Sequence, residues 1–584
     1  MRPPTRLLRQ GQTNMIDHTA GQVDAIQVKG SVPALAVECA NWGTNMDRRV
    51  LLKKSSLLAG AVLSRRIFGA PQAASNTSPQ ARTTYGSIMG SVRDGIFTFK
   101  GIPYGSDTSK RRFMAPTPPV PWIGVREATS FGPRAPQPGV HGSLSPNRGY
   151  HLPPEQGPVG EDCLHLNVWT PGLRDGRKRP VMVYIHGGAY SSGSANNDLY
   201  DGMNLCRRGD VVFVTLNHRL NLFGFLYLAD LAPGFEDSGN AGMLDLVLAL
   251  QWVRNNIEEF GGDPKRVLIF GQSGGGAKCA TLMGMPAAEG LFHRVVTMSG
   301  QQITASRRES ATARTLAVLK ELHLPESRIA DLNTLPMEQL IQESRAAGYF
   351  GPVKDGRTLV RDPFDPDAPP LSADIPMILG NTHDETRVLI GGGDPSTFSL
   401  TWETLPARLS VVAQFLGDKK PDDVVRQYRA MHPDYSPSDV FFATTTAFRS
   451  WRGQVIEAER RAAQPEAQRH TWVYELDWRT PIDGGKWGAP HTLDIPLALD
   501  NVAVADGMTG NGLEAVQLAA QMSETWIAFA RTGNPNHKGL PEWRPYDLSK
   551  RQTMSFSSPS RLVSDPRGNE RRLIEQVPYT QPGT

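Results

Sequence analysis

Residues 271–275 (Gly-Gln-Ser-Gly-Gly) hold a serine hydroxyl, that of Ser273, between glycines. The apolar, strand-like run 266–270 precedes them, and a helix-like pattern at 277–283 follows. A G-x-S-x-G turn between a strand and a helix lifts the serine oxygen out of the sheet, where it can attack a carbonyl carbon. We therefore expect Ser273 to be the nucleophile of an acyl transfer; the alternative is a glycine-rich turn without catalysis.

A second turn of small residues, His-Gly-Gly-Ala-Tyr at 186–190, follows the apolar run 181–185. Small residues let backbone N–H groups approach an oxygen that gains negative charge, and each such donor contributes roughly 10²–10³ in rate. Two turns of this kind, each directly after its own strand, favour a catalytic role over a structural one.

The serine also needs a base to take its proton and a carboxylate to orient that base. In this strand–turn–helix arrangement the chain order is serine, acid, histidine. Seven histidines follow Ser273, and His491 fits because it lies in a loop beyond the strand-like run 472–476. Asp384 and Glu385 both fit as the acid, because both follow another apolar run.

The elements that must position these residues alternate between strand and helix from residue 179 onward. Such alternation predicts a parallel sheet with right-handed crossovers. Upstream, strand-like runs lie at 87–92 and 96–99, and the Pro- and Gly-rich segment 105–160 is expected to form long loops. The remaining expected strands are 181–185, 211–216, 266–270, 295–298, 375–379 and 472–476, and the expected helices are 244–257, 277–283 and 513–530.

From about residue 82 to about residue 575 the chain resembles the type-B carboxylesterase family, which includes cholinesterases and bacterial para-nitrobenzyl esterases. The resemblance implies an α/β-hydrolase fold: a mostly parallel central sheet flanked by helices, with large loop and helical insertions. Besides 186–190, the segments that carry it are 99–104 (Phe-Lys-Gly-Ile-Pro-Tyr), 161–168 (Glu-Asp-Cys-Leu-His-Leu-Asn-Val), 217–219 (Asn-His-Arg), 223–226 (Phe-Gly-Phe-Leu), 251–253 (Gln-Trp-Val) and 260–264 (Phe-Gly-Gly-Asp-Pro).

The same resemblance implies a complete set of catalytic residues. It selects Glu385 over Asp384 as the acid, and His491 as the base for Ser273. The family's activity is the hydrolysis of carboxylic esters through an acyl-enzyme, which needs no metal and no organic cofactor. The backbone donors to the oxyanion that it implies are Gly188, Ala189 and Gly274.

Three departures from the family pattern carry information. Gln272 and Gly274 stand where the family often has Glu and Ala. Without a carboxylate before the serine, one attraction for a cationic substrate is lost, so we expect neutral small-molecule esters and disfavour choline esters. Cys163 lies in the family's usual disulfide position, but Ala135 replaces its expected partner, so we expect a free Cys163.

The sequence predicts the residues of the substrate pocket less well than the catalytic residues. Tyr190, Trp451 and Trp487 are candidates to line it, although aromatic side chains more often belong to the core. Segments 105–160 and 340–450 are expected to shape the pocket, and they do not identify the ester. Hydrolysis of an amide or carbamate by the same residues is one alternative. A non-catalytic cholinesterase-like binding protein is another, disfavoured because all three catalytic positions are filled.

The net charge and the N-terminal sequence limit the possible partners and the location of the protein. The net charge is +4, but residues 1–74 hold ten Lys/Arg and four Asp/Glu, so the rest of the chain is slightly acidic and has no basic excess for nucleic acid. We expect an upstream extension at 1–45, a twin-arginine-like signal peptide at 46–74 and a single catalytic domain at 75–584. This predicts a periplasmic or secreted enzyme; the alternative is a cytoplasmic enzyme with a disordered N-terminus. No apolar run is long enough for a membrane span, and the oligomeric state is not predicted.

Overall fold

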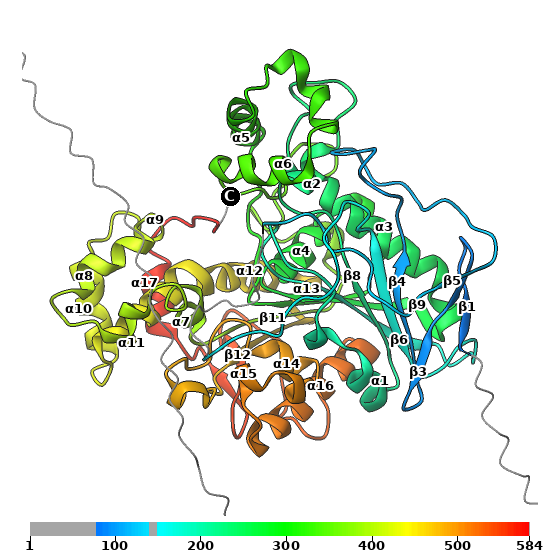
Figure 1. The fold of residues 1–584 in the computed structure, drawn as a ribbon. Helices are drawn as coiled ribbons and strands as arrows, with labels where there is room; N and C mark the ends of the chain where they lie inside the picture. Colours follow the sequence, from blue (N-terminus) through cyan, green and yellow to red (C-terminus); the bar gives the residue numbers. More distant parts are fainter. Residues whose placement is uncertain (1–77, 139–148, 583–584) are drawn as a thin grey trace, which may run out of the picture. The chain divides into compact units, whose positions relative to one another are not determined.

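An 11-stranded mixed sheet runs through the computed structural model, which describes residues 78–138 and 149–582 (Figure 1). The expected extension at 1–45 and signal peptide at 46–74 lie outside the described residues. In spatial order, the strands are β14 (Arg561–Ser564), β13 (Gln552–Phe556), β12 (Thr471–Leu476), β11 (Met377–Thr382), β10 (Arg294–Met298), β9 (Gly262–Gln272), β7 (Arg179–Ile185), β8 (Val212–Leu216), β6 (His165–Thr170), β4 (Ile96–Pro103) and β3 (Ser91–Arg93).

The centre of this sheet is parallel and its margins are antiparallel. All neighbouring strands from β8 to β13 are parallel, whereas β14 and the strands β6, β4 and β3 pair antiparallel. Every residue of β7 is buried, and its side chains alternate between two cores: Val183 packs in one and Tyr184 in the other. Burial on both faces explains why this strand is apolar from Val181 to Ile185, after the ion-paired Arg179 at its start. The expected mostly parallel sheet is confirmed.

Helices cover both faces of the sheet (Figure 1). The expected helices are confirmed with small shifts at their ends. No helix of the described chain is long and apolar enough to cross a membrane. One face carries α3 (Ala241–Asn256), α4 (Gly274–Met283) and α12 (Arg452–Ala462), and the other carries α1 (Met203–Gly209), α14 (Asp494–Ala498) and α16 (Leu513–Thr532).

The insertions into this framework are largely helical. Residues 340–450, expected to shape the pocket, contain several helices that share a third apolar core with α17 (Gly568–Ile574). The expected strand 87–92 is divided at Gly90 between two strands, and the first of them, β2 (Ser87–Met89), joins a small sheet with β1 (Gln80–Arg82) and β5 (Val125–Glu127). The inserted and short helices are α2 (Asn221–Phe225), α5 (Arg308–Glu321), α6 (Met337–Ser344), α7 (Glu385–Leu389), α8 (Leu405–Arg408), α9 (Ala413–Leu416), α10 (Pro421–Met431), α11 (Pro437–Thr445), α13 (Pro465–Gln468), α15 (Asp506–Thr509) and α17 (Gly568–Ile574).

Two residues singled out by the sequence have structural roles. Cys163 is buried and unpaired, as expected, because Ala135 offers no second thiol. Arg219, just beyond β8, forms a buried ion pair with Asp245 on α3, with Nη2 at 2.6 Å from Oδ1. This pair ties the segment after β8 to the helix, so neither residue is free to bind a substrate.

Candidate active site

Ser273 sits in the sharp turn between β9 and α4. Its backbone has φ = +58° and ψ = −127°, a region that costs a non-glycine residue on the order of 1–3 kcal/mol. The Ser273 N–H donates to the Met298 carbonyl at 2.7 Å, which fixes the turn to the end of β10. The hydrogen bond to the sheet thus maintains this strained backbone conformation. The conformation in turn presents the Ser273 hydroxyl at the carboxyl edge of the parallel strands.

The glycine at 275 lets this turn lie against the end of β7. A Cβ at Gly275 would stand 2.0 Å from the Ile185 carbonyl oxygen, so no side chain fits there. This close approach brings Ser273 beside the 186–190 turn, which directly follows β7. The two glycine-rich motifs, far apart in sequence, therefore meet at one place.

The three residues expected to supply oxyanion donors lie in these two turns, and Ala189 and Gly274 line the cavity at Ser273 whereas Gly188 does not. Gly188 and Ala189 have φ = +84° and +52°, and neither N–H donates to any described residue. Gly274 begins α4, where the first N–H groups of a helix lack partners within it. A Cβ at Gly274 would stand 2.1 Å from the Ala189 carbonyl oxygen, so the 186–190 turn and the start of α4 are in direct contact.

His491 follows β12 in a loop, and its ring is held by Glu385. The Nδ1–H of His491 donates a short hydrogen bond to Oε2 of the Glu385 carboxylate. Glu385 is fully buried and also accepts from Asn381 Nδ2 and the Thr382 N–H, both at 3.0 Å. Burial alone would raise the pKa of Glu385, but His491 and these donors hold it below its usual value. Glu385 is therefore ionised, and Nε2 is the ring nitrogen of His491 that makes no bond to a carboxylate among the described residues.

Asp384, the other candidate acid, has a different role. Its Oδ2 accepts from the Ala489 N–H at 2.9 Å, and its Oδ1 lies 3.1 Å from Nε of Arg387. These bonds hold the segment that leads into His491. The imidazole of His491 thus contacts Glu385 and not Asp384, which separates the two alternatives left open by chain order alone.

Gln272 lies beside the imidazole of His491. Its side chain is buried, and Nε2 is 3.4 Å from both ring nitrogens of His491. A neutral amide therefore occupies the place where the family often carries a carboxylate. Glu385 is the only carboxylate in hydrogen-bond contact with His491 among the described residues.

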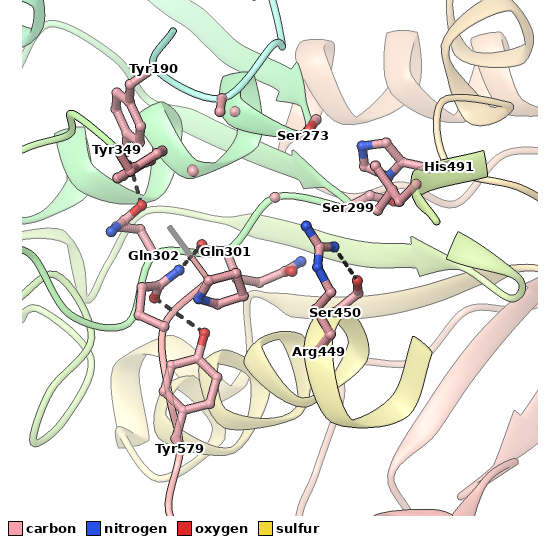
Figure 2. Close-up of a pocket in the computed structure, with 17 residues that line it drawn as sticks. Tyr190, Ser273, Ser299, Gln301, Gln302, Tyr349, Arg449, Ser450, His491 and Tyr579 are labelled. Atoms are coloured by element: carbon pink, nitrogen blue, oxygen red, sulfur yellow. Dashed lines mark hydrogen bonds between the residues drawn. The ribbon is translucent and has the colours of Figure 1, made fainter. Parts of the chain in front are cut away.

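Ser273 and His491 line one cavity of about 290 Å³ (Figure 2). No hydrogen bond joins the two side chains in the described structure. Catalytic hydrogen bonds are often long before a substrate binds and tighten only in the complex. The lining mixes polar and apolar groups and comprises Ala189, Tyr190, Ser273, Gly274, Ala277, Ser299, Gly300, Gln301, Gln302, Tyr349, Leu389, Arg449, Ser450, His491, Tyr579, Gln581 and Pro582.

Of the three aromatic candidates, only Tyr190 lines this cavity. Trp451 faces away and stacks on the guanidinium of Arg567, whose Cζ is 4.3 Å from the ring centroid. Trp487 packs edge-on against Phe398 at 5.2 Å between ring centroids. The expectation that these two tryptophans line the pocket is not met, because both rings are buried in the apolar cores instead.

Several lining residues gave no signal in the sequence. Gln301 and Gln302 follow β10, Arg449 lies in the 340–450 insertion, and Tyr579 comes from the C-terminal tail. None belongs to a motif, and only the fold brings them to Ser273. The described part of segment 105–160, by contrast, contributes no residue to the lining.

One group outside the cavity has ligand atoms close enough for a metal ion. His383, Glu475 and Asp477 place one such atom each within 4.8 Å of one another. Arg567 Nη1 lies 3.2 Å from Glu475 Oε1 and already supplies positive charge there. Around Ser273 itself, the described lining contains no Asp, Glu or Cys.

Comparison with known proteins gives the family. The model of the carboxylesterase family matches residues 77–573. The chain belongs to this family. It is 34% identical over 509 residues to para-nitrobenzyl esterase of Bacillus subtilis (strain 168), covering 84% of this chain and 97% of the relative. It is 35% identical over 491 residues to phenmedipham hydrolase of Pseudarthrobacter oxydans, covering 80% and 92%.

A solved structure supports the same conclusion for the fold. Carboxylesterase EST55 of Geobacillus stearothermophilus, at pH 6.2, is similar with a TM-score of 0.74 and 35% identity, over 85% of this chain and 99% of that one. The expected α/β-hydrolase fold is therefore confirmed, and so is the expected class of activity: the chain is a serine carboxylic-ester hydrolase.

Proposed function

We propose that Ser273, His491 and Glu385 hydrolyse a carboxylic ester in two steps. Ser273 Oγ attacks the ester carbonyl carbon while Nε2 of His491 takes the hydroxyl proton. The tetrahedral intermediate collapses, His491 gives the proton to the leaving alcohol, and the acyl group stays on Ser273. Water then attacks the acyl-enzyme with the same proton transfers and releases the acid.

The hydrogen bond from His491 to the buried Glu385 is the observation that carries this proposal. It fixes the imidazole with Nδ1 protonated, so that Nε2 can act as a base in the cavity that Ser273 lines. The ionised carboxylate also stabilises the imidazolium that forms during attack.

The N–H groups of Gly188, Ala189 and Gly274 are proposed as the oxyanion donors. Those of Gly188 and Ala189 have no acceptor among the described residues, and the Gly274 N–H lies at the N-terminus of α4, where the helix dipole favours negative charge. Donors fixed before the reaction cost no reorganisation in the transition state.

Neutral esters are proposed as substrates in preference to cationic ones. Gln272 places an amide, not a carboxylate, beside His491, and no acid lines the described cavity. The same residues could attack an amide or a carbamate, so the activity on these bonds has to be measured beside the activity on esters. The non-catalytic alternative is disfavoured because the triad positions are filled and His491 is oriented.

A panel of p-nitrophenyl esters of rising acyl length tests the assignment. Wild type should hydrolyse the panel with a profile that reports the cavity size, and Ser273→Ala should lose turnover. Ser410→Ala, which removes an exposed hydroxyl elsewhere, is the matched control and should keep full activity. Unchanged turnover in Ser273→Ala would refute the nucleophile. An anilide and a carbamate with the same acyl group measure the alternative activities.

Export through the leader at 46–74 is the proposed route to a periplasmic or secreted location. Its support is the layout of paired arginines at 48 and 49, an apolar run at 55–63 and small residues at 69–74. N-terminal sequencing of the protein from its native host tests this, since the mature chain should begin after the small-residue stretch. A mature chain that retains Asp47 would contradict export.

A further inference from the structure

Arg449 is the one permanently charged residue among the described residues that line the cavity at Ser273. It lies in η10 (Thr446–Trp451), a π-helical turn between α11 and α12. Turns of this type are rare and occur frequently at functional sites. In Figure 2 the guanidinium extends from this turn toward Ser299, on the side of the cavity where Ser273 and His491 lie.

No described carboxylate pairs with Arg449. Within the described part of the chain, its one hydrogen bond runs from Nη1 to the Ser450 hydroxyl at 3.2 Å. The nearby acid Glu385 is engaged by His491, Asn381 and Thr382. Burial lowers the pKa of Arg449 and the charge of Glu385 opposes this, yet a guanidinium keeps its proton in a protein. A half-buried positive charge thus faces the cavity without a carboxylate partner among residues 78–138 and 149–582.

Other arginines near this insertion are neutralised. Arg387 pairs with Asp384 at 3.1 Å, Arg460 with Asp365 at 2.9 Å, and Arg567 with Glu475 at 3.2 Å. Arg452 has no described ion-pair partner either, but it does not line the cavity. A charge withdrawn from water is costly unless a partner compensates it, so a free guanidinium at the substrate site favours an anionic ligand.

The rest of the lining offers nothing that would repel an anion. Amides and hydroxyls surround the guanidinium, including those of Gln301, Ser299 and Ser450, and no Asp or Glu lines the described cavity. Gln272, beneath His491, is neutral as well. A carboxylate in the cavity could therefore accept two parallel N–H bonds from Arg449 without meeting another carboxylate in the described lining, since the nearby Glu385 is buried and engaged by His491.

We propose that the preferred substrates are esters that carry a free carboxylate, such as monoesters of dicarboxylic acids, with Arg449 binding the carboxylate while Ser273 attacks the ester carbonyl. The inference rests on the proposed function and names the substrate class of the same site. Each turnover consumes the monoester and one water, and yields the alcohol and a dicarboxylate plus one proton. The preference for neutral over cationic esters came from Gln272 and from the lack of an acid in the described lining, and both observations argue against cations but not against anions.

The test uses matched pairs of esters in a pH-stat. Monoethyl succinate, glutarate and adipate are each compared with the ethyl ester of the corresponding half-amide, which replaces the carboxylate by a neutral group of the same shape. Wild type should have the higher kcat/KM for the anionic member of at least one pair. Since hydrogen bonds to charged groups are worth about 1.5–3 kcal/mol, Arg449→Gln should lower kcat/KM for that ester by roughly 10- to 150-fold. The loss for the half-amide should be clearly smaller than the loss for the anionic ester, and Arg449→Lys should restore part of the latter.

Three results would overturn the inference. They are equal losses for both members of a pair in Arg449→Gln, no loss for either, or a wild type that favours the half-amides throughout. Wild-type inhibition gives a second readout that does not depend on the variant folding: glutarate should inhibit p-nitrophenyl acetate hydrolysis competitively and glutaramide should not, and equal inhibition by both would also overturn it. In each of these cases the proposed function is tested separately. It would still be supported if Ser273→Ala loses the turnover of p-nitrophenyl esters.

Discussion

Replacing Gly274 by alanine should damage the oxyanion site, although the family often has alanine there. In this structure the added Cβ would stand 2.1 Å from the Ala189 carbonyl oxygen and 2.4 Å from Ala189 Cα, where ordinary contact begins near 3.4 Å. Both neighbours are backbone atoms, so the 186–190 turn must move by about 1 Å, and a displacement of that size costs roughly 10²-fold in rate. As a result, the N–H groups of Gly188 and Ala189 move away from that of Gly274, and the three proposed donors no longer face one oxygen.

We therefore expect kcat of Gly274→Ala to fall by about 10²–10³-fold, equivalent to about 3–4 kcal/mol of transition-state stabilisation. KM for p-nitrophenyl acetate should change little, because the oxyanion contacts act on the transition state. Gly284→Ala, at the other end of α4, is the control: its Cβ would meet nothing closer than 3.5 Å. Thermal melting of both variants separates misfolding from lost catalysis. A folded Gly274→Ala with undiminished kcat would refute this geometry of the oxyanion site.

Two further predictions concern buried charges. Glu385→Gln should lower kcat by roughly 10⁴-fold in the p-nitrophenyl ester assay, because an amide does not hold His491 with Nδ1 protonated; a loss below tenfold would argue against Glu385 as the acid. Lys278 is fully buried beneath the 186–190 turn, where Nζ donates to the His186 carbonyl at 3.0 Å, and burial lowers its pKa to about 7. The unfolded chain keeps this proton up to about pH 10, so wild-type stability should rise between about pH 7 and pH 10, by at most about 4 kcal/mol. Lys278→Met should raise the melting temperature more at pH 6 than at pH 9; a difference that does not shrink as the pH rises would contradict this.

The sequence was sufficient for the residues that lie in local patterns. The turns at 271–275 and 186–190 each follow a buried strand, and the strand–helix alternation predicted the parallel sheet that aligns them. The order of serine, acid and histidine narrowed the triad but left Asp384 beside Glu385. The structure separates them, because Oε2 of Glu385 contacts His491 whereas Asp384 bonds to Ala489 and Arg387.

The substrate pocket could not be predicted in the same way. Its walls come from residues without a shared pattern, such as Gln301, Arg449 and Tyr579, which insertions and the C-terminal tail bring together. An arginine in sequence looks the same whether a carboxylate pairs with it or not, and aromatic residues are equally suited to core and pocket. Trp451 and Trp487 therefore gave a wrong expectation for the lining, while Arg449 gave none.

Covalent trapping of Ser273 tests the proposed nucleophile. The wild-type enzyme is treated with a fluorophosphonate, which reacts with activated serines, and the labelled residue is located by peptide mass spectrometry. We predict loss of esterase activity in step with labelling of Ser273, and no labelling in His491→Ala, where the base is absent. Complete inactivation with the label on another residue, or full activity in a chain labelled at Ser273, would contradict the mechanism.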